Sequence, residues 1–342
     1  MMIGKNIRYY RLLREMSQEA LANSIGIGKM AISNYESGKR TPDYATSRKI
    51  SKALDVSLAK LLAQNDETLV IKHGAFRKHS TVTKAQQEVI LGKADRYLGR
   101  LFEVVSFVGD PALPSMPDFK PINVSDVEAA GRHLRSILGL PETGPIGNIT
   151  DILENKGYII CPIDYDKRIF SGNSGTVNGR PYIAINSTMP AERQRFTLIH
   201  ELAHLVFVFD SQQNEERMVD AIAGAFLLPK ADIVRELGPK RTDIRGDLRN
   251  IQREYGVSMA AIAMRARQAN IITKETYETT MKWMSKNGLR ADEHSNIIPE
   301  KTHLLEQLIS RAVSEDEIGI SKAAELLELP LTDARRLCYG GV

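Results

Sequence analysis

Two histidines and a glutamate share one turn of a predicted helix in the segment RFTLIHELAHLVF, residues 195–207. His200 and His204 are four residues apart, so their side chains lie side by side and can bind one metal ion together. Glu201 lies about 100° further round the helix and faces the neighbouring coordination position. This H-E-x-x-H spacing is typical of catalytic zinc sites, because a structural zinc site closes its fourth position and has no use for the glutamate. We therefore expect Zn²⁺ as the cofactor and Glu201 as the catalytic base.

A catalytic zinc ion needs a third protein ligand and an open position for water. The following segment FDSQQNEERMVDAIAGAFLLPK offers four acidic candidates, Asp210, Glu215, Glu216 and Asp220. Glu216 and Asp220 are four residues apart on a predicted helix, so a ligating Glu216 leaves Asp220 able to accept a hydrogen bond from a ligating imidazole. Glu215 points about 100° away from Glu216, and Asp210 follows the first helix so soon that it would need a tight reversal. We favour Glu216 as the ligand and Asp220 as its supporting residue.

An α+β pattern surrounds this motif between residues 124 and 230. Helices are predicted over SDVEAAGRHLRSIL and NITDILENKG, where Asn148 can cap the second helix. The segment YIICPI has the composition of a strand, and SGTVNGRPYIAIN contains the pair Asn178 and Gly179 between β-prone runs, which predicts a hairpin. The sequence assigns no residue to oxyanion stabilisation; Tyr158, Tyr165 and Tyr182 are candidates, each with a structural role as the alternative.

A helix-turn-helix is predicted in MSQEALANSIGIGKMAISNYESGKRTP near the N-terminus. Ser17 can cap a helix over residues 18–24, Gly26 can make the turn, and a second helix runs from about residue 28 to residue 36. A second helix held in this way can lie in a DNA major groove. Its predicted reading face is Lys29, Met30, Ala31, Ser33 and Asn34. Predicted phosphate contacts are Gln18, Lys39 and Arg40.

The charge of the chain is concentrated at this end. Residues 1–60 contain eleven Lys and Arg against five Asp and Glu, a net charge of +6, whereas the whole chain carries +4 and the rest therefore −2. A basic module on a near-neutral body indicates that the N-terminal part meets a polyanion. Double-stranded DNA is the expected partner.

The composition is that of an ordinary globular protein of two or three domains. The 342 residues, 42% hydrophobic and 26% charged, show neither a signal peptide nor an apolar run long enough to span a bilayer. We therefore expect a cytoplasmic protein with no membrane partner. Cys161 and Cys338 lie far apart without metal-ligand spacing, so both are expected to be reduced.

The remaining segments are predicted to be mainly helical. Residues 66–123 begin as a connector, become helical and end in the Pro-rich linker PALPSMPDFKP. YGVSMAAIAMRARQANIIT and GISKAAELLELPLTDARRL, in the region 231–342, both resemble helix-turn-helix pieces. Residues 299–342 contain eight acidic against five basic residues, a poor balance for phosphate contact. We therefore expect an interaction or homodimerisation role for this end rather than a second DNA-reading role.

Two family resemblances follow from these motifs. The run from Ile7 to Leu61, with Ser-Gln-x-x-Leu-Ala, Ile-Ser-x-Tyr-Glu-x-Gly-Lys and the following proline, resembles the Cro/repressor (XRE) helix-turn-helix family. That resemblance implies base contacts from Lys29, Met30 and Asn34 and a phosphate contact from Gln18. PYIAINSTMPAERQRFTLIHELAHLVF followed by ERMVDAIAGAFLLP resembles the ImmA/IrrE zinc metallopeptidases. That second resemblance implies Glu216 as the third ligand, although Val219 and Asp220 stand where the family has Ala-Asn and Ile222 stands where it has Phe.

The resemblances together imply a multidomain protein. Its expected parts are an all-α helix-turn-helix domain (1–65), a helical connector and Pro-rich linker (66–123), an α+β zincin-like metallopeptidase core (124–230) and a mainly α-helical C-terminal region (231–342). The family resemblance implies hydrolysis of a peptide bond in a repressor or other regulatory protein, or in the chain itself, to derepress mobile-element or stress genes. The alternative is a non-proteolytic regulator, such as the antitoxin of a toxin-antitoxin pair, with a structural or sensory metal domain.

Overall fold

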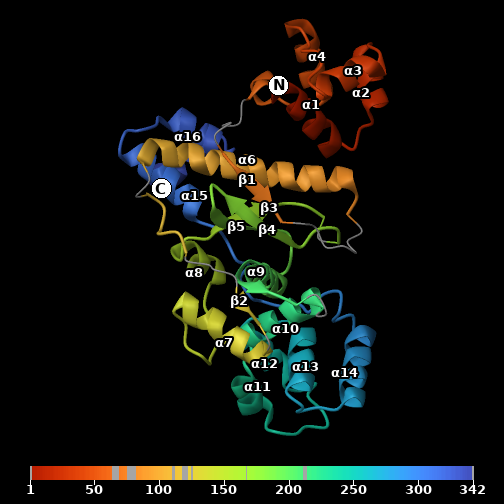
Figure 1. Cartoon of the computed structure of the whole chain (residues 1–342), viewed down its shortest axis with the longest axis vertical. Helices are drawn as coiled ribbons and strands as arrows, with labels where there is room; N and C mark the ends of the chain where they lie inside the picture. The colour runs from red at the N-terminus through yellow and green to blue at the C-terminus, as the bar shows by residue number, and fades with distance from the viewer. Residues whose placement is uncertain are drawn as a thin grey trace. The chain divides into compact units, whose positions relative to one another are not determined.

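The computed structural model describes residues 2–63, 69–74, 82–109, 112–117, 122–124, 126–166, 168–210 and 214–340. The chain forms two compact units, the first comprising Met1–Ile71 and Phe76–Ser106 and the second Lys72–Ala75 and Phe107–Val342. An all-α N-terminal part, a mixed α/β middle part and a helical C-terminal part confirm the predicted multidomain fold class (Figure 1). The domain boundaries expected from sequence stay a prediction. None of the described helices is long and apolar enough to cross a membrane.

The first unit is a small helical bundle followed by a long helix. Its helices are α1 (Met2–Leu13), α2 (Gln18–Ile25), α3 (Lys29–Glu36), α4 (Tyr44–Ala53), α5 (Leu58–Leu62) and α6 (Lys84–Val108). The Ser17 hydroxyl accepts a hydrogen bond from the Ala20 amide and begins α2, and Gly26, with φ 72°, ends it in the left-handed conformation. Both features were predicted. Ile7, Leu21 and Ile32 are fully buried and fix the helix-turn-helix against α1.

A four-stranded sheet organises the second unit. Its strands are β1 (Ile71–His73), β3 (Ile159–Ile163), β4 (Gly172–Val177) and β5 (Arg180–Asn186), in the order β1-β4-β5-β3. β3 pairs with β5 in parallel and β4 pairs with β5 in antiparallel fashion. Asn178 and Gly179 join β4 to β5 with φ 49° and 80°, the geometry of a type I′ hairpin. The predicted hairpin is confirmed, whereas the strand β1 in the connector was not expected.

Helices pack beneath this sheet and around it. α9 (Ala191–Val206) contacts β4 and β5 and runs beneath the sheet in Figure 1. It also packs against α10 (Glu215–Leu227), which in turn packs against α7 (Val127–Leu138). The remaining elements of this part are α8 (Ile149–Asn155), β2 (Ile122–Asn123) and β6 (Phe207–Val208), the last two paired in parallel. The predicted α+β pattern is therefore present, with α9 and α10 side by side.

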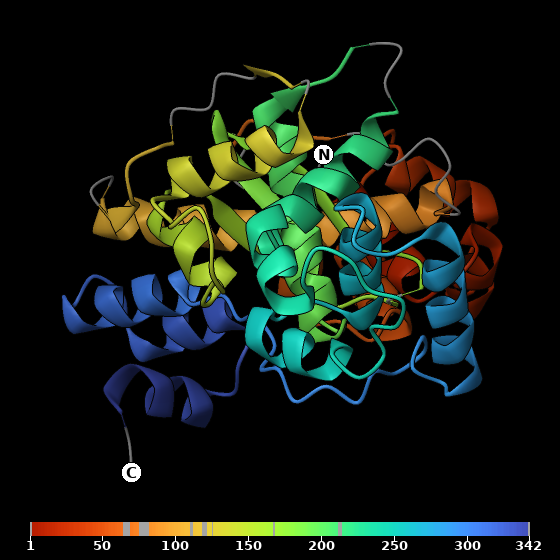
Figure 2. The same cartoon turned by 90° about the horizontal axis from the view of Figure 1, so that it is seen from below.

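The C-terminal part consists of two groups of helices. The first group contains α11 (Lys230–Leu237), α12 (Leu248–Tyr255), α13 (Met259–Gln268) and α14 (Lys274–Lys286). These four helices share one continuous hydrophobic core with α7, α9 and α10. The second group contains α15 (Leu304–Ser314), α16 (Ile320–Leu327) and α17 (Leu331–Tyr339), and Figure 2 shows these blue helices packed together.

A buried ion pair connects the segment before α15 to α9. Arg195 in α9 and Glu300 approach to 2.7 Å, with only 7% and 4% of their side chains exposed. Arg195 also donates to the carbonyls of Ile146, Gly147 and Gly256, and the Thr150 amide donates to Glu300. A buried charge needs this many partners to offset its desolvation. The segment before α15 is therefore held to the N-terminal half of α9.

Candidate metal centre and nucleic-acid interface

The candidate metal centre lies where α9 passes the first turn of α10. His200 and His204 come from α9, and their side chains are 1% and 20% exposed. Asn214 accepts a hydrogen bond from the Arg217 amide and so begins α10, which places Glu216 in its first turn. Among the described residues, His200, His204 and Glu216 form the group of metal-ligating side chains, with one ligand atom from each within 4.8 Å of the others.

The distances between these three side chains fit one small ion. The two Nε2 atoms are 3.2 Å apart, His200 Nε2 is 3.6 Å from Glu216 Oε2, and His204 Nε2 is 3.7 Å from Glu216 Oε1. Ligand atoms of a tetrahedral zinc ion, each about 2.0–2.1 Å from the metal, lie about 3.3–3.4 Å from one another. Two imidazoles and one carboxylate also form a donor set that zinc prefers, with a fourth position left open. The residues therefore fit the metal.

A second carboxylate supports each histidine. Asp220 Oδ1 lies 2.8 Å from His200 Nδ1, and Glu215 Oε1 lies 2.9 Å from His204 Nδ1. A partner on Nδ1 fixes the ring orientation and leaves Nε2 directed toward the ion. Asp220, the predicted supporting residue, thus contacts His200. The structure gives Glu215 a place beside His204 that the sequence did not predict, because that contact depends on how α10 crosses α9.

Glu201 lies in a buried position next to the sheet. The residue is 7% exposed, and Ser174 Oγ in β4 donates a hydrogen bond of 2.9 Å to Glu201 Oε2. A Cβ atom at Gly172, two residues earlier in β4, would lie 2.5 Å from Thr197 Cγ2 and 3.1 Å from Glu201 Cγ. The strand can approach α9 this closely only with glycine there. Sequence reasoning missed Ser174 and Gly172, since only the register of β4 brings them to Glu201.

The three tyrosines considered for oxyanion stabilisation have different surroundings. Tyr158 is 2% exposed, and burial raises its pKa to about 12. Tyr182 is fully buried, and its hydroxyl lies 2.5 Å from His73 Nδ1. The backbone carbonyl of Tyr165 accepts a hydrogen bond from Asn186. None of the three is thereby assigned to the metal centre.

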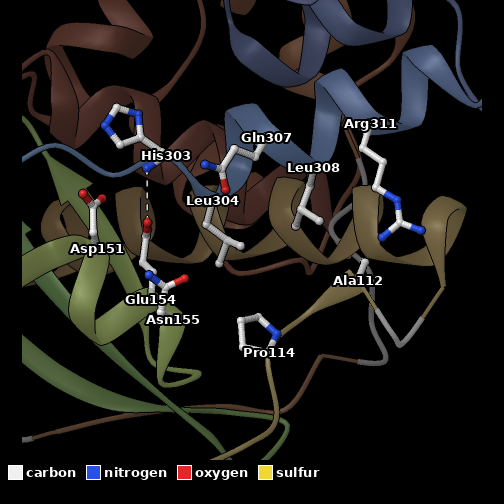
Figure 3. A pocket seen from close by; sticks show the side chains of 10 residues that line it. All are labelled: Ala112, Pro114, Asp151, Glu154, Asn155, His303, Leu304, Gln307, Leu308 and Arg311. Carbon is white, nitrogen blue, oxygen red and sulfur yellow. Dashed lines mark hydrogen bonds between the residues drawn. The ribbon is translucent and has the colours of Figure 1, made fainter. Parts of the chain in front are cut away.

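A separate cavity of about 500 Å³ lies between α8 and α15. Figure 3 shows Glu154 of α8 beside the backbone of His303, whose amide donates to Glu154 Oε2 at 3.2 Å. Burial raises the pKa of Glu154 to about 7 despite this hydrogen bond and a second one from the Leu304 amide. A carboxyl group with a raised pKa therefore lines this cavity.

The predicted DNA-reading residues lie on and around α3. Lys29, Lys39 and Arg40 are exposed, Met30 is 72% exposed, and Asn34 is half-buried. The side-chain amide nitrogen of Gln18, Nε2, donates a hydrogen bond of 2.8 Å to Glu36 Oε2. Arg11 donates two hydrogen bonds, of 2.6 and 2.9 Å, to the same carboxylate. Gln18 therefore fixes the start of α2 to the end of α3.

Comparisons with known proteins match the two motif-bearing regions. Residues 7–61 match the helix-turn-helix family, and residues 162–267 match the IrrE N-terminal-like domain of peptidases. The cryptic phage CTXphi transcriptional repressor RstR of Vibrio cholerae is 34% identical over 68 residues, 20% of this chain and 61% of that protein. The helix-turn-helix-type transcriptional regulator YqaE of Bacillus subtilis is 41% identical over 61 residues, 18% of this chain and 53% of that protein.

A third relative is matched over nearly its whole length. A helix-turn-helix-type transcriptional regulator of Methanocaldococcus jannaschii is 31% identical over 61 residues, 18% of this chain and 92% of that protein. The chain therefore belongs to the helix-turn-helix transcriptional regulators of the XRE type and carries an IrrE N-terminal-like peptidase domain on the same polypeptide. Peptidases of this family are generally metal-dependent. The predicted combination of the two families is confirmed.

Proposed function

We propose that the chain is a DNA-binding transcriptional regulator with a zinc metalloendopeptidase domain that cleaves a regulatory protein. The cleaved protein is a cognate repressor or the chain itself, and cleavage derepresses mobile-element or stress genes. The observation that carries the proposal is the geometry of the centre. Ligand atoms of His200, His204 and Glu216 lie within 4.8 Å of one another, and a buried carboxylate, Glu201, lies on the same helix as the two histidines. A structural zinc site has no need of that carboxylate.

The proposed reaction adds water across the scissile amide. His200, His204 and Glu216 would hold Zn²⁺, which when bound polarises the carbonyl and lowers the pKa of the attacking water. Glu201 takes a proton from the water as the new C–O bond forms and passes it to the nitrogen as the C–N bond breaks. Ser174 holds one carboxylate oxygen of Glu201 and leaves the other for the proton.

The proposed DNA contacts are those of the helix-turn-helix unit. Lys29, Met30 and Asn34 on α3 read base edges, because they lie at the family's base-facing positions. Lys39 and Arg40 contact phosphates, as does the start of α2 at Gln18. The charge of +6 over residues 1–60 supports an electrostatic contribution to DNA affinity.

Comparison of wild type with Glu201→Gln tests the peptidase. Both proteins are loaded with zinc and incubated with purified candidate repressors and alone, and the products are identified by mass spectrometry. We expect cleavage by wild type and none by Glu201→Gln, with zinc content unchanged because Glu201 is not a ligand. Equal inertness of both zinc-loaded proteins toward every repressor, and toward themselves, would contradict the peptidase proposal.

We also propose that α15–α17 mediate homodimerisation. Leu329, Leu331 and Tyr339 in and before α17 are exposed by 39%, 45% and 62%. Exposed apolar side chains grouped on one element favour burial against a partner. Replacement of Leu331 and Tyr339 by Glu is expected to abolish self-association in sedimentation velocity. Unchanged oligomers with weakened DNA binding would instead assign these helices to DNA.

A further inference from the structure

The connector strand, residues 71–74, lies on the outer edge of β4. The strand order β1-β4-β5-β3 makes β1 the neighbour of β4 (Figure 1). The Gly74 amide donates a hydrogen bond of 2.7 Å to the Ser174 carbonyl, and Asn173 Nδ2 donates one of 3.1 Å to the Gly74 carbonyl. A segment that precedes the peptidase domain in sequence therefore supplies its edge strand.

The strand that carries this edge, β4, also contacts the proposed general base. Ser174 donates through its side chain to Glu201 and accepts through its backbone carbonyl from Gly74. A polypeptide strand paired with β4 at this point therefore bonds to Ser174, the residue whose side chain contacts the Glu201 carboxylate. Peptides that bind an exposed strand use main-chain hydrogen bonds for affinity. The connector strand already occupies those hydrogen-bonding groups.

The fit of the connector strand to this edge is specific. A Cβ atom at Gly175 would lie 2.3 Å from the Lys72 carbonyl oxygen, and a Cβ atom at Gly74 would lie 2.5 Å from the Ser174 carbonyl oxygen. Both glycines are needed for the two backbones to approach this closely. His73 adds a hydrogen bond of 2.5 Å between its Nδ1 and the hydroxyl of buried Tyr182. The contact therefore combines backbone pairing with a side-chain anchor.

The route of the chain links this strand to the DNA-binding unit. The chain leaves the first unit at Ile71, contributes Lys72–Ala75 to the second unit and returns to the first at Phe76. The strand is thus covalently joined at both ends to the unit that contains the helix-turn-helix. Release of the strand from β4 would change how the two units are tethered.

We propose that the connector strand is an intramolecular peptide ligand of the peptidase's substrate-binding edge and keeps extended peptides off β4 until it is displaced. The inference rests on the proposed peptidase function for its biological meaning. The occupancy of the edge is testable without any cleavage. No covalent step is involved, since one set of main-chain hydrogen bonds replaces another.

A peptide-binding experiment on the full-length protein tests the proposal. The probe is a fluorescein-labelled peptide of sequence LVIKHG, residues 69–74, and its binding is measured by fluorescence anisotropy. Gly74→Pro removes the amide donor to Ser174, and Tyr182→Phe removes the hydroxyl that meets His73 while keeping the ring in the core. Lys72→Ala is the matched control, because it changes an exposed side chain and keeps the strand's backbone intact.

We expect the peptide to bind Gly74→Pro at least about fivefold more tightly than wild type, because loss of the Gly74 amide donor and of the close backbone fit frees the edge. Tyr182→Phe should show a smaller gain and Lys72→Ala none. Amide hydrogen exchange over residues 172–177, followed by mass spectrometry, should rise in the same order. Equal peptide binding and equal exchange in wild type and both variants would overturn the proposal, as would cleavage of wild type within the connector strand itself.

These outcomes separate the inference from the peptidase proposal. If Glu201→Gln and wild type are both inert as peptidases but Gly74→Pro gains peptide binding, the strand occupies a binding edge that has another use. If the peptidase is active and Gly74→Pro cleaves repressors no faster than wild type, the strand does not restrain the site.

Discussion

Removal of the Asp220 carboxylate is the sharpest test of the metal centre. Asp220 Oδ1 is 2.8 Å from Nδ1 of His200; the Asp220 side chain is 53% exposed but the His200 side chain only 1%, so water reaches this imidazole less easily than the 20% exposed imidazole of His204. Loss of a carboxylate that orients a metal-ligating histidine costs about 10–100-fold in metal affinity, or about 1.4–2.7 kcal/mol. We expect the loss of zinc affinity in Asp220→Ala to lie in the upper half of that range. Asp220→Asn, which keeps an acceptor oxygen, should lose less.

The corresponding carboxylate on the other histidine gives an internal comparison. Glu215 Oε1 is 2.9 Å from Nδ1 of His204, but the side chains of His204 and Glu215 are 20% and 57% exposed. Water can then take over part of the role of Glu215, so Glu215→Ala should cost at most about tenfold in zinc affinity. Glu278→Ala, in which an exposed acid of α14 is lost, controls for the change in net charge.

Zinc affinity is measured by competition with a fluorescent chelator at fixed pH, and thermal unfolding of each metal-free variant verifies the fold. The expected order of affinity loss is Asp220→Ala, then Asp220→Asn, then Glu215→Ala, with Glu278→Ala unchanged. Wild-type affinity in Asp220→Ala would refute the support role of that residue. A larger loss in Glu215→Ala than in Asp220→Ala would refute the argument from burial.

Three further predictions concern other contacts. Ser174→Ala should lower kcat for repressor cleavage about fivefold, the effect of one lost hydrogen bond of about 1 kcal/mol, with zinc affinity unchanged. An equal fall in zinc affinity would contradict a role limited to Glu201. Arg11→Met should lower the free energy of unfolding by about 3–5 kcal/mol in urea titrations, because it leaves the buried carboxylate of Glu36 without its cationic partner and with only the hydrogen bond from Gln18. A loss below about 1 kcal/mol would show that Glu36 does not depend on Arg11 in this way. Burial raises the pKa of Glu154 from 4.5 to about 7, so the folded state binds more protons than the unfolded state between these two pH values. The contribution of Glu154 to the unfolding free energy of the metal-free protein should therefore be greatest below pH 4.5. It should fall by up to about 3 kcal/mol as the pH rises to about 7. The difference in unfolding free energy between wild type and Glu154→Gln should carry this dependence, and a pH-independent difference would refute it.

Much of the site could be predicted from local spacing. The i and i+4 positions of His200 and His204 define one helix face, and the structure places Glu216 within 4.8 Å of them. Ser17 as a cap and the Asn178 and Gly179 turn were also predicted, since each depends on neighbours within a few residues. These features follow from helix geometry and from backbone conformations that few residue types adopt.

Other parts of the site could not be predicted because they join elements distant in sequence. The hydrogen bond from Ser174 to Glu201 requires the register of β4 against β5 and the packing of α9 beneath them. Strand β1 could not be predicted, because a strand of three residues is too short to show an alternation of apolar and polar side chains. Its pairing depends on the edge of β4, to which β1 is hydrogen-bonded.

The sequence alone therefore determined the chemistry available to this protein: a basic helix-turn-helix at one end and the two histidines and Glu201 on one helix. Only the tertiary structure decided how that chemistry is supported and covered. The packing of α9 against α10 gives each histidine its own carboxylate partner. The order of the strands brings Ser174 within hydrogen-bonding distance of Glu201 and pairs the connector strand with Ser174. The physical reason is that helix faces and turns are fixed by neighbours along the chain, whereas partners across elements are fixed by packing of the whole unit.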